Sequence, residues 1–210
     1  FIMKFRALLL ALTLVITVSG TAAAAVTEHR ESTTNLSIAY PVLALEDTAT
    51  ADLINTDIEK LAADMRTAYE NGTFYRGELG YRVHLDDDNF LSVTFTDLRY
   101  ELRANQPVRH DYGCVYYKKT GQRIPLSFFV HLTPSDLDGE AVNGHLYNEQ
   151  GRNTPVQPEK SVREIPTNYF LGGSGYVCPI FQAGELTAST GPTYILLDAS
   201  IIDYFNRKNK

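Results

Sequence analysis

A few groups of side chains in this sequence have the residue types that catalysis or metal binding requires. The run at 86–89, three aspartates followed by an asparagine, offers several oxygen ligands at close range, as calcium requires. His110 stands beside Asp111, and an imidazole next to a carboxylate can act as an acid–base element. Glu101 and Glu185 could form the carboxylate couple of a glycoside hydrolase.

The spacing around these residues favours structural roles over catalysis. The run at 86–89 lacks the glycine and the distal glutamate of an EF-hand loop, so it is typical of a solvated hairpin turn. No HExxH or GxSxG motif is present, although a Ser–His–Asp set can also assemble from residues distant in sequence. The glycine-rich segment 172–175 precedes strand-like residues, which predicts a hairpin turn rather than a phosphate loop. We expect no catalytic residues, no metal site and no cofactor.

The two cysteines, Cys114 and Cys178, each stand in a strand-like run. In an oxidising compartment such a pair often forms a disulfide, provided that the two strands are adjacent and both side chains share one face. Two buried free thiols are the alternative. No other metal ligands accompany the pair at close spacing, so the cysteines do not indicate a metal site.

Residues 1–25 have the pattern of a secretory signal peptide. Lys4 and Arg6 supply the positive start. An apolar run follows at 7–18, and the alanines at 22–25 offer small-residue cleavage sites. The apolar run is shorter than the roughly twenty residues that a membrane-spanning helix needs. We therefore expect an exported protein, in the periplasm, on the cell surface or secreted, whose mature form has no membrane span.

The balance of charges is acidic. The formal net charge is -6, and it becomes -8 once Lys4 and Arg6 leave with the signal peptide, since each carries one positive charge. An acidic surface argues against nucleic acid and anionic lipid as partners and favours a cationic partner. Solubility is an alternative reason for the same charge.

Hydrophobic periodicity predicts an α+β fold, in which an antiparallel sheet packs against one long helix and short additional helices. We expect 26–35 to be a loose leader and 36–210 to form a single domain. The long helix is predicted over 48–70, because its apolar residues recur at steps of three and four. These residues are Ile54, Ile58, Leu61, Met65 and Ala68.

The remaining predicted elements are short. Alternation of apolar and polar residues predicts strands from Tyr81 onward, with a β-bulge at 96–97, where the alternation slips by one residue. The segment 36–43 contains a proline and is expected to be an edge strand or an extended lead-in. Thr133 and Asp198 are expected to cap two short helices.

Two segments of the chain resemble one bacterial family. In 168–191 a glycine turn and a strand lead to an aromatic residue with glutamine, a Glu-Leu pair, an alanine and a glycine. The matching residues are Phe181, Gln182, Glu185, Leu186, Ala188 and Gly191. Tyr112 and Gly113, followed by Thr-Gly-Gln-Arg-Ile-Pro-Leu at 120–126, match a second stretch. The chain thus resembles, over about residues 36–206, the extracytoplasmic domain shared by the anti-sigma-V factor RsiV and the N-terminal region of PdaC-type peptidoglycan deacetylases.

This resemblance implies a binding role. In the anti-sigma factor the module senses lysozyme, and in the deacetylase it is an accessory domain beside a wall-modifying enzyme. The family's histidine-bearing stretch before the Thr-Gly turn is replaced here by Ala-Asn-Gln-Pro at 104–107. We expect the ligand to contact one exposed connection where polar and aromatic groups stand together. Its residues are Phe181, Gln182, Glu185 and Leu186.

These observations favour an exported bacterial module that binds or senses a ligand and is not catalytic. The expected ligand is a lysozyme-type cationic protein or the glycan of peptidoglycan. The alternatives are a small cell-wall-acting hydrolase and a structural envelope protein with no soluble ligand. A buried carboxylate pair in a cleft would favour the hydrolase.

The signal peptide can be tested directly. We expect cleavage after Ala24 or Ala25, because these small residues follow the apolar run. N-terminal sequencing of the exported protein should therefore begin at Ala25 or Val26. A mature protein that still begins at Met3 would contradict export through this segment.

Overall fold

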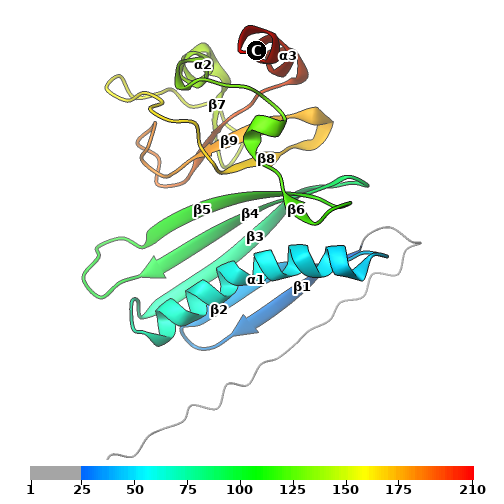
Figure 1. The fold of residues 1–210 in the computed structure, drawn as a ribbon. Helices are drawn as coiled ribbons and strands as arrows, with labels where there is room; N and C mark the ends of the chain where they lie inside the picture. Colours follow the sequence, from blue (N-terminus) through cyan, green and yellow to red (C-terminus); the bar gives the residue numbers. More distant parts are fainter. Residues whose placement is uncertain (1–24) are drawn as a thin grey trace, which may run out of the picture.

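A six-stranded sheet separates one long helix from a smaller C-terminal layer (Figure 1). The computed structural model describes residues 25–210, and all of the predicted signal peptide except Ala25 lies outside them. The first half of the chain consists of β1 (Ala25–Ser32), β2 (Leu36–Ala44), α1 (Thr48–Glu70), β3 (Arg76–Asp86), β4 (Phe90–Tyr100), β5 (Val108–Tyr117) and β6 (Gln122–Arg123). The second half consists of η1 (Leu126–Phe128), α2 (Pro134–Glu140), η2 (Ala141–His145), β7 (Leu146–Asn148), β8 (Tyr169–Leu171), η3 (Gly173–Gly175), β9 (Val177–Phe181), β10 (Thr193–Ile195) and α3 (Ala199–Lys208).

The six strands stand in sequence order across the first sheet, β1-β2-β3-β4-β5-β6. Every neighbouring pair is antiparallel except β2 and β3. Those two are parallel because α1 lies between them in sequence and carries the chain back to the other end of the sheet. The predicted α+β fold with one long helix is confirmed, and its sheet is mixed rather than wholly antiparallel.

Strand β1 corrects the prediction that 26–35 is a loose leader. It pairs with β2 along its whole length, from Ala25 opposite Ala44 to Ser32 opposite Ser37. The segment is polar because it is an outer strand with many exposed side chains. Main-chain hydrogen bonds hold it to the sheet, and polarity gives no sign of them. With β1 at its side, β2 is an inner strand and not the predicted edge strand.

Helix α1 has the bounds that its apolar stripe predicts. Ile54, Ile58 and Met65 are fully buried in the core between the helix and the sheet. Asp47 caps the helix, since its carboxylate accepts a hydrogen bond from the N–H of Ala49 at 3.1 Å. Within residues 25–210, no helix is both long enough and apolar enough to cross a membrane.

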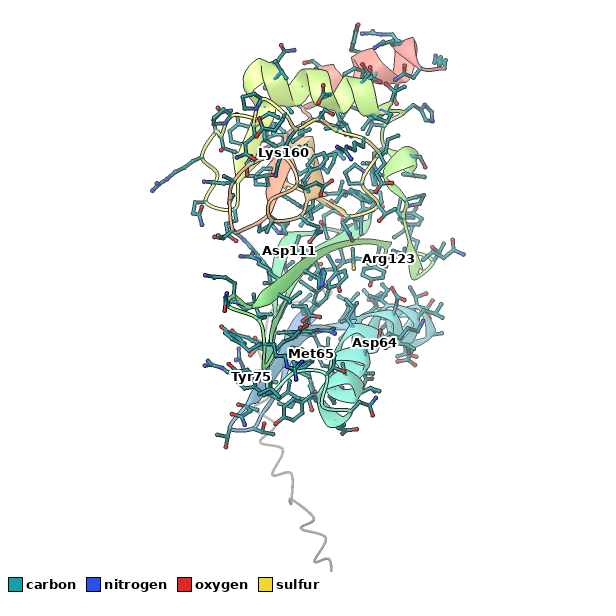
Figure 2. All side chains as sticks on the ribbon, turned by 90° about the vertical axis from the view of Figure 1, so that its left-hand side faces the viewer. Asp64, Met65, Tyr75, Asp111, Arg123 and Lys160 are labelled. Atoms are coloured by element: carbon teal, nitrogen blue, oxygen red, sulfur yellow. The ribbon has the colours of Figure 1, made fainter. Side chains whose placement is uncertain are left out.

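The two faces of the six-stranded sheet bury separate cores. On the helix side, Val93 of β4 packs in the core that contains Met65. On the other side, Val115 of β5 belongs to the core of the C-terminal layer. Figure 2 shows the same division, with Met65 on the helix side of the sheet and Asp111 on the side of the C-terminal layer.

The C-terminal layer comes into close backbone contact with the sheet at Gly113. Its strands have the order β7-β10-β9-β8, and β8 packs against β5 and β4. A Cβ atom at Gly113 would lie 2.1 Å from the carbonyl oxygen of Tyr169, so only glycine lets the two backbones approach this closely. Asn168 Oδ1 accepts the N–H of Gly113 at 3.3 Å. Ser92 Oγ accepts the N–H of Leu171 at 2.8 Å, so these two amides keep partners at the contact.

Short helices close the outer side of the C-terminal layer. Thr133 caps α2 in a capping box with Asp136, and Asp198 caps α3, as predicted. Asp136 also accepts a hydrogen bond from Lys208, which ties α2 to α3. Burial acts to raise the pKa of Asp136, but hydrogen bonds from Lys208 and Thr133 outweigh it and lower that pKa to about 2. The glycine-rich segment 172–175 forms the predicted turn between β8 and β9.

Both cysteines are free, buried thiols, so the disulfide considered from the sequence does not form. Cys114 packs in the core beside α1. Cys178 packs with Phe170 and Ile180 in the C-terminal layer. The two side chains belong to different cores, whereas a disulfide needs both on one side at bonding distance. Burial raises the pKa of Cys178 to about 12, which leaves this thiol protonated at neutral pH.

The close approach at Gly113 generates a stability prediction. Gly113→Ala should destabilise the protein by about 1–3 kcal/mol or more, because the added methyl group overlaps the backbone of Tyr169. Gly80→Ala is the matched control, since a Cβ atom at Gly80 would meet nothing within 4 Å. Urea unfolding of both variants measures the difference. Equal stabilities would contradict the tight contact between the layers.

Candidate functional site

A cavity of about 520 Å³ lies between the six-stranded sheet and the C-terminal layer, and we call it the inter-sheet cleft. Strands β3, β4 and β5 form its floor, and the C-terminal layer supplies the opposite wall. Asp111, which lines the cleft, is labelled in Figure 2. The volume falls in the range of roughly 300–1,000 Å³ that is usual for small-molecule sites. The lining residues are Gly80, Tyr81, Arg82, His84, Thr94, Thr96, Arg109, Asp111, Glu149, Gln150, Phe170, Ile180, Pro192, Thr193 and Tyr194.

Arg109 joins two carboxylates across the cleft. Its guanidinium donates to both oxygens of Asp111, at 2.9 and 3.1 Å, from the same strand. It also donates to Glu149, at 2.6 Å, in the turn that follows β7. The Thr96 hydroxyl adds a hydrogen bond of 2.8 Å to Asp111. This network fixes Arg109, Asp111 and Glu149 in place, because each of these three charged groups is held by an oppositely charged partner.

The predicted contact residue Gln182 has a structural role instead. Its side-chain amide accepts the N–H of Asp111 at 2.9 Å and donates to the carbonyl oxygen of Asp111 at 2.8 Å. The amide thus pairs with the main chain of β5 much as a neighbouring strand would. A residue held in this way fastens the turn after β9 to the sheet.

The other three predicted contact residues do not form an exposed patch. Phe181 and Leu186 are fully buried in the core of the C-terminal layer and cannot contact a partner. Glu185 is exposed, and its carboxylate accepts the N–H of Gln182 at 2.7 Å within the same turn. The prediction of one exposed connection is therefore wrong for Phe181 and Leu186. Their neighbours in sequence suggested a loop, but the apolar side chains point inward to fill the core.

His84 enters the cleft from a β-bulge. The pairing of β3 with β4 shifts register between Val83 and Leu85, so the bulge lies at His84 and not at the predicted 96–97. The imidazole Nε2 shares a hydrogen bond of 2.8 Å with the Thr94 hydroxyl. Burial, with the nearby Arg82 charge, lowers the pKa of His84 to about 4, so this imidazole is uncharged at neutral pH.

Aromatic rings form one wall of the cleft. The imidazole of His84 stacks on Phe170 with ring centroids 4.0 Å apart, and Phe170 meets Tyr194 edge to face at 5.2 Å. Thr193 stands beside Tyr194 and is almost fully buried. Among the described residues, its hydroxyl oxygen is a buried side-chain atom without a hydrogen-bond partner, which is uncommon in a folded protein. Aromatic rings and hydrogen-bonding groups thus lie side by side around the cavity.

The other sequence candidates serve as turn or surface residues. Asp87 accepts the N–H groups of Asn89 and Phe90 at 2.8 and 2.7 Å, which makes the acidic run a hairpin turn. His110 is exposed while Asp111 is buried, because successive residues of a strand point to opposite faces. Over residues 25–210, no cluster of three or more histidine, cysteine or acidic side chains is placed to hold a metal ion.

The sequence does not indicate several of the residues that line the cleft. Asp111 was named, and Arg109 could have been found with it, because residues two apart on a strand share a face. Glu149, Thr193 and Tyr194 come from distant segments and gave no local signal. Only the stacking of the second sheet on the first brings them beside Asp111.

Two solved structures share the fold of this chain. One is a member of the DUF3298 family from Bacteroides fragilis, with a TM-score of 0.58 and 12% sequence identity over 89% of this chain and 95% of that chain. The other is a DUF3298 family protein from Pseudomonas aeruginosa, with a TM-score of 0.54 and 9% identity over 86% of this chain and 91% of that chain. At these identities the likeness establishes the α+β fold of these proteins and nothing finer.

No protein-family model and no curated protein matches the sequence. The resemblance to the extracytoplasmic domains of RsiV and of PdaC-type deacetylases therefore stays a prediction.

The role of Gln182 can be tested by stability. Gln182→Leu keeps a similar side-chain volume but removes both hydrogen bonds to Asp111, so we expect a loss of about 1–3 kcal/mol. Gln106→Leu, in the exposed turn after β4, should change the free energy of unfolding by less than about 0.5 kcal/mol. Chemical unfolding measures the free energy of unfolding of both variants and of the unaltered protein. A harmless Gln182→Leu would show that the residue does not fasten the layers.

Proposed function

We propose that the protein is an exported, non-catalytic binding module and that its ligand, a saccharide of the cell-wall type, occupies the inter-sheet cleft. One observation carries the proposal: the cleft places aromatic rings beside fixed carboxylate, guanidinium and hydroxyl groups and the Gln150 amide. A sugar ring has the matching character, because its C–H faces stack on aromatic rings while its hydroxyls both donate and accept hydrogen bonds.

The charges of the cleft support an uncharged ligand. Two guanidinium groups, of Arg82 and Arg109, stand against two carboxylates, of Asp111 and Glu149. Both carboxylates are already bonded to Arg109, so little negative charge is left to attract a basic protein into the cleft. A lysozyme-type partner would have to use the acidic outer surface instead. The saccharide is therefore the ligand that this site favours.

Export rests on the sequence pattern of residues 1–25, with its basic start, apolar run and alanine cleavage sites. An exported protein with a saccharide cleft would meet glycan outside the cytoplasmic membrane. The binding role and the expected location therefore support each other.

A hydrolase is the second candidate, because Asp111 and Glu149 form a carboxylate pair in a cleft. A glycosidase needs one carboxyl group that can give a proton to the leaving oxygen. Both oxygens of Asp111 accept hydrogen bonds, from Arg109 and Thr96, so Asp111 offers no O–H toward the cleft. Glu149 would have to be the acid, but its two oxygens accept hydrogen bonds from Arg109 and from Gln150, so neither carboxyl group offers an O–H to a leaving oxygen. Binding without turnover is therefore the better proposal.

Titration calorimetry of the mature protein with soluble glycan strands from peptidoglycan tests the proposal. We expect binding, with no shortened products by chromatography. Gln150→Ala should weaken the affinity about three- to tenfold, because the exposed amide at the cleft rim loses one hydrogen bond to the ligand. Gln106→Ala, which lies outside the cleft lining, should leave the affinity unchanged.

The other results separate the alternatives. Binding to lysozyme without binding to glycan would refute the saccharide proposal. Product formation that disappears in Glu149→Gln would establish the hydrolase instead. Equal effects of Gln150→Ala and Gln106→Ala on the affinity would place the ligand elsewhere on the molecule.

A further inference from the structure

A second hollow, of about 330 Å³, adjoins the inter-sheet cleft, and we call it the outer hollow. It lies over the strands β1, β2 and β3. Gly80, Tyr81 and Arg82 line both spaces, so the two are neighbours on either side of these residues of β3. The lining residues of the outer hollow are Glu28, Arg30, Ser37, Ala39, Glu78, Leu79, Gly80, Tyr81, Arg82 and Val83.

We propose that the two hollows form one groove and that the ligand is an oligosaccharide long enough to occupy both. This inference rests on the proposed saccharide function and adds the size class of the ligand. A single sugar would fill only part of the inter-sheet cleft and leave the outer hollow unused. A chain of linked sugars would continue across β3 and gain contacts in the outer hollow.

Gly80 makes the passage between the hollows. It pairs with Thr96, and paired residues of neighbouring strands share a face, so Gly80 lies on the same face as the Thr96 hydroxyl in the cleft. A Cβ atom built on Gly80 meets no other atom within 4 Å. Packing within the protein therefore does not require glycine here, in contrast to Gly113. The missing side chain leaves open space where the two hollows join.

The charges along the groove match an uncharged, hydroxyl-rich chain. The outer hollow adds Glu28, Glu78 and Arg30 to the balanced set of the cleft, and Arg30 donates to Glu28 at 2.8 Å. Within residues 25–210, Arg82 has no carboxylate within 4.0 Å and is exposed at the junction. Its guanidinium is free to donate to sugar oxygens on either side. A strongly charged polymer of either sign would meet like charges along this path.

Calorimetry with β-1,4-linked N-acetylglucosamine oligomers, from the disaccharide to the hexasaccharide, tests the inference. For the unaltered mature protein we expect the affinity to rise at least about tenfold with length. Gly80→Val places a branched side chain at the junction, so for this variant the affinity should no longer rise with the length of the oligomer. Gly173→Val, at an exposed turn glycine that also has nothing within 4 Å, is the matched control and should keep the gain.

A second variant keeps the test decisive if Gly80→Val does not fold. Glu78 is exposed and lines only the outer hollow, so Glu78→Ala should weaken binding of the hexasaccharide and leave that of the disaccharide unchanged. The extended groove would be overturned if the unaltered protein bound all lengths with equal affinity. It would also be overturned if Gly80→Val and Glu78→Ala both kept the full gain with length. Either result would leave the proposed function standing. Failure of every oligomer and of peptidoglycan strands to bind would overturn both.

Discussion

The architecture depends on one steric constraint, the contact of two backbones at Gly113. Strand β8 can approach β5 this closely only because no Cβ atom stands between Gly113 and Tyr169. The approach would be costly if it left main-chain groups without partners, and Ser92 and Asn168 accept two of the amides at the contact. With β8 packed in this way, the second sheet covers part of the first (Figure 1). The inter-sheet cleft lies between the two sheets.

The polar groups of the cleft also hold the layers together. Arg109 links β5 to the turn after β7, and Gln182 links β5 to the turn after β9. The groups that would face the proposed ligand are therefore already fixed by their neighbours. Preorganisation of this kind lowers the entropy cost of binding, because fewer side chains need to be ordered. The same contacts explain why a polar residue typical of binding sites, such as Gln182, contributes to the stability of the fold.

The two sides of the six-stranded sheet have different tasks. On the side that faces α1, apolar residues of the sheet such as Val93 pack with Met65 of the helix in a closed core. The opposite side carries Thr94, Thr96 and Asp111, and the C-terminal layer covers it only in part. His84 points to this polar side because it stands two residues after Arg82, and the bulge there turns Leu85 to the same side as well. A groove can thus cross the sheet without weakening the core beneath it.

The sequence by itself determined the elements whose causes are local. The stripe of Ile54, Ile58 and Met65 predicts α1, and the caps at Thr133 and Asp198 and the glycine turn at 172–175 were found because capping and turn chemistry act over a few residues. Only the tertiary structure decided which strands pair and which faces stack.

Strand pairing and sheet packing made a strand of residues 26–32, placed the bulge at His84 and put the two cysteines in separate cores. They also buried Phe181 and Leu186 and assembled a cleft from Arg109, Glu149 and Tyr194. The physical reason is that burial and pairing depend on residues far apart in the chain, and no local pattern records which segments will meet.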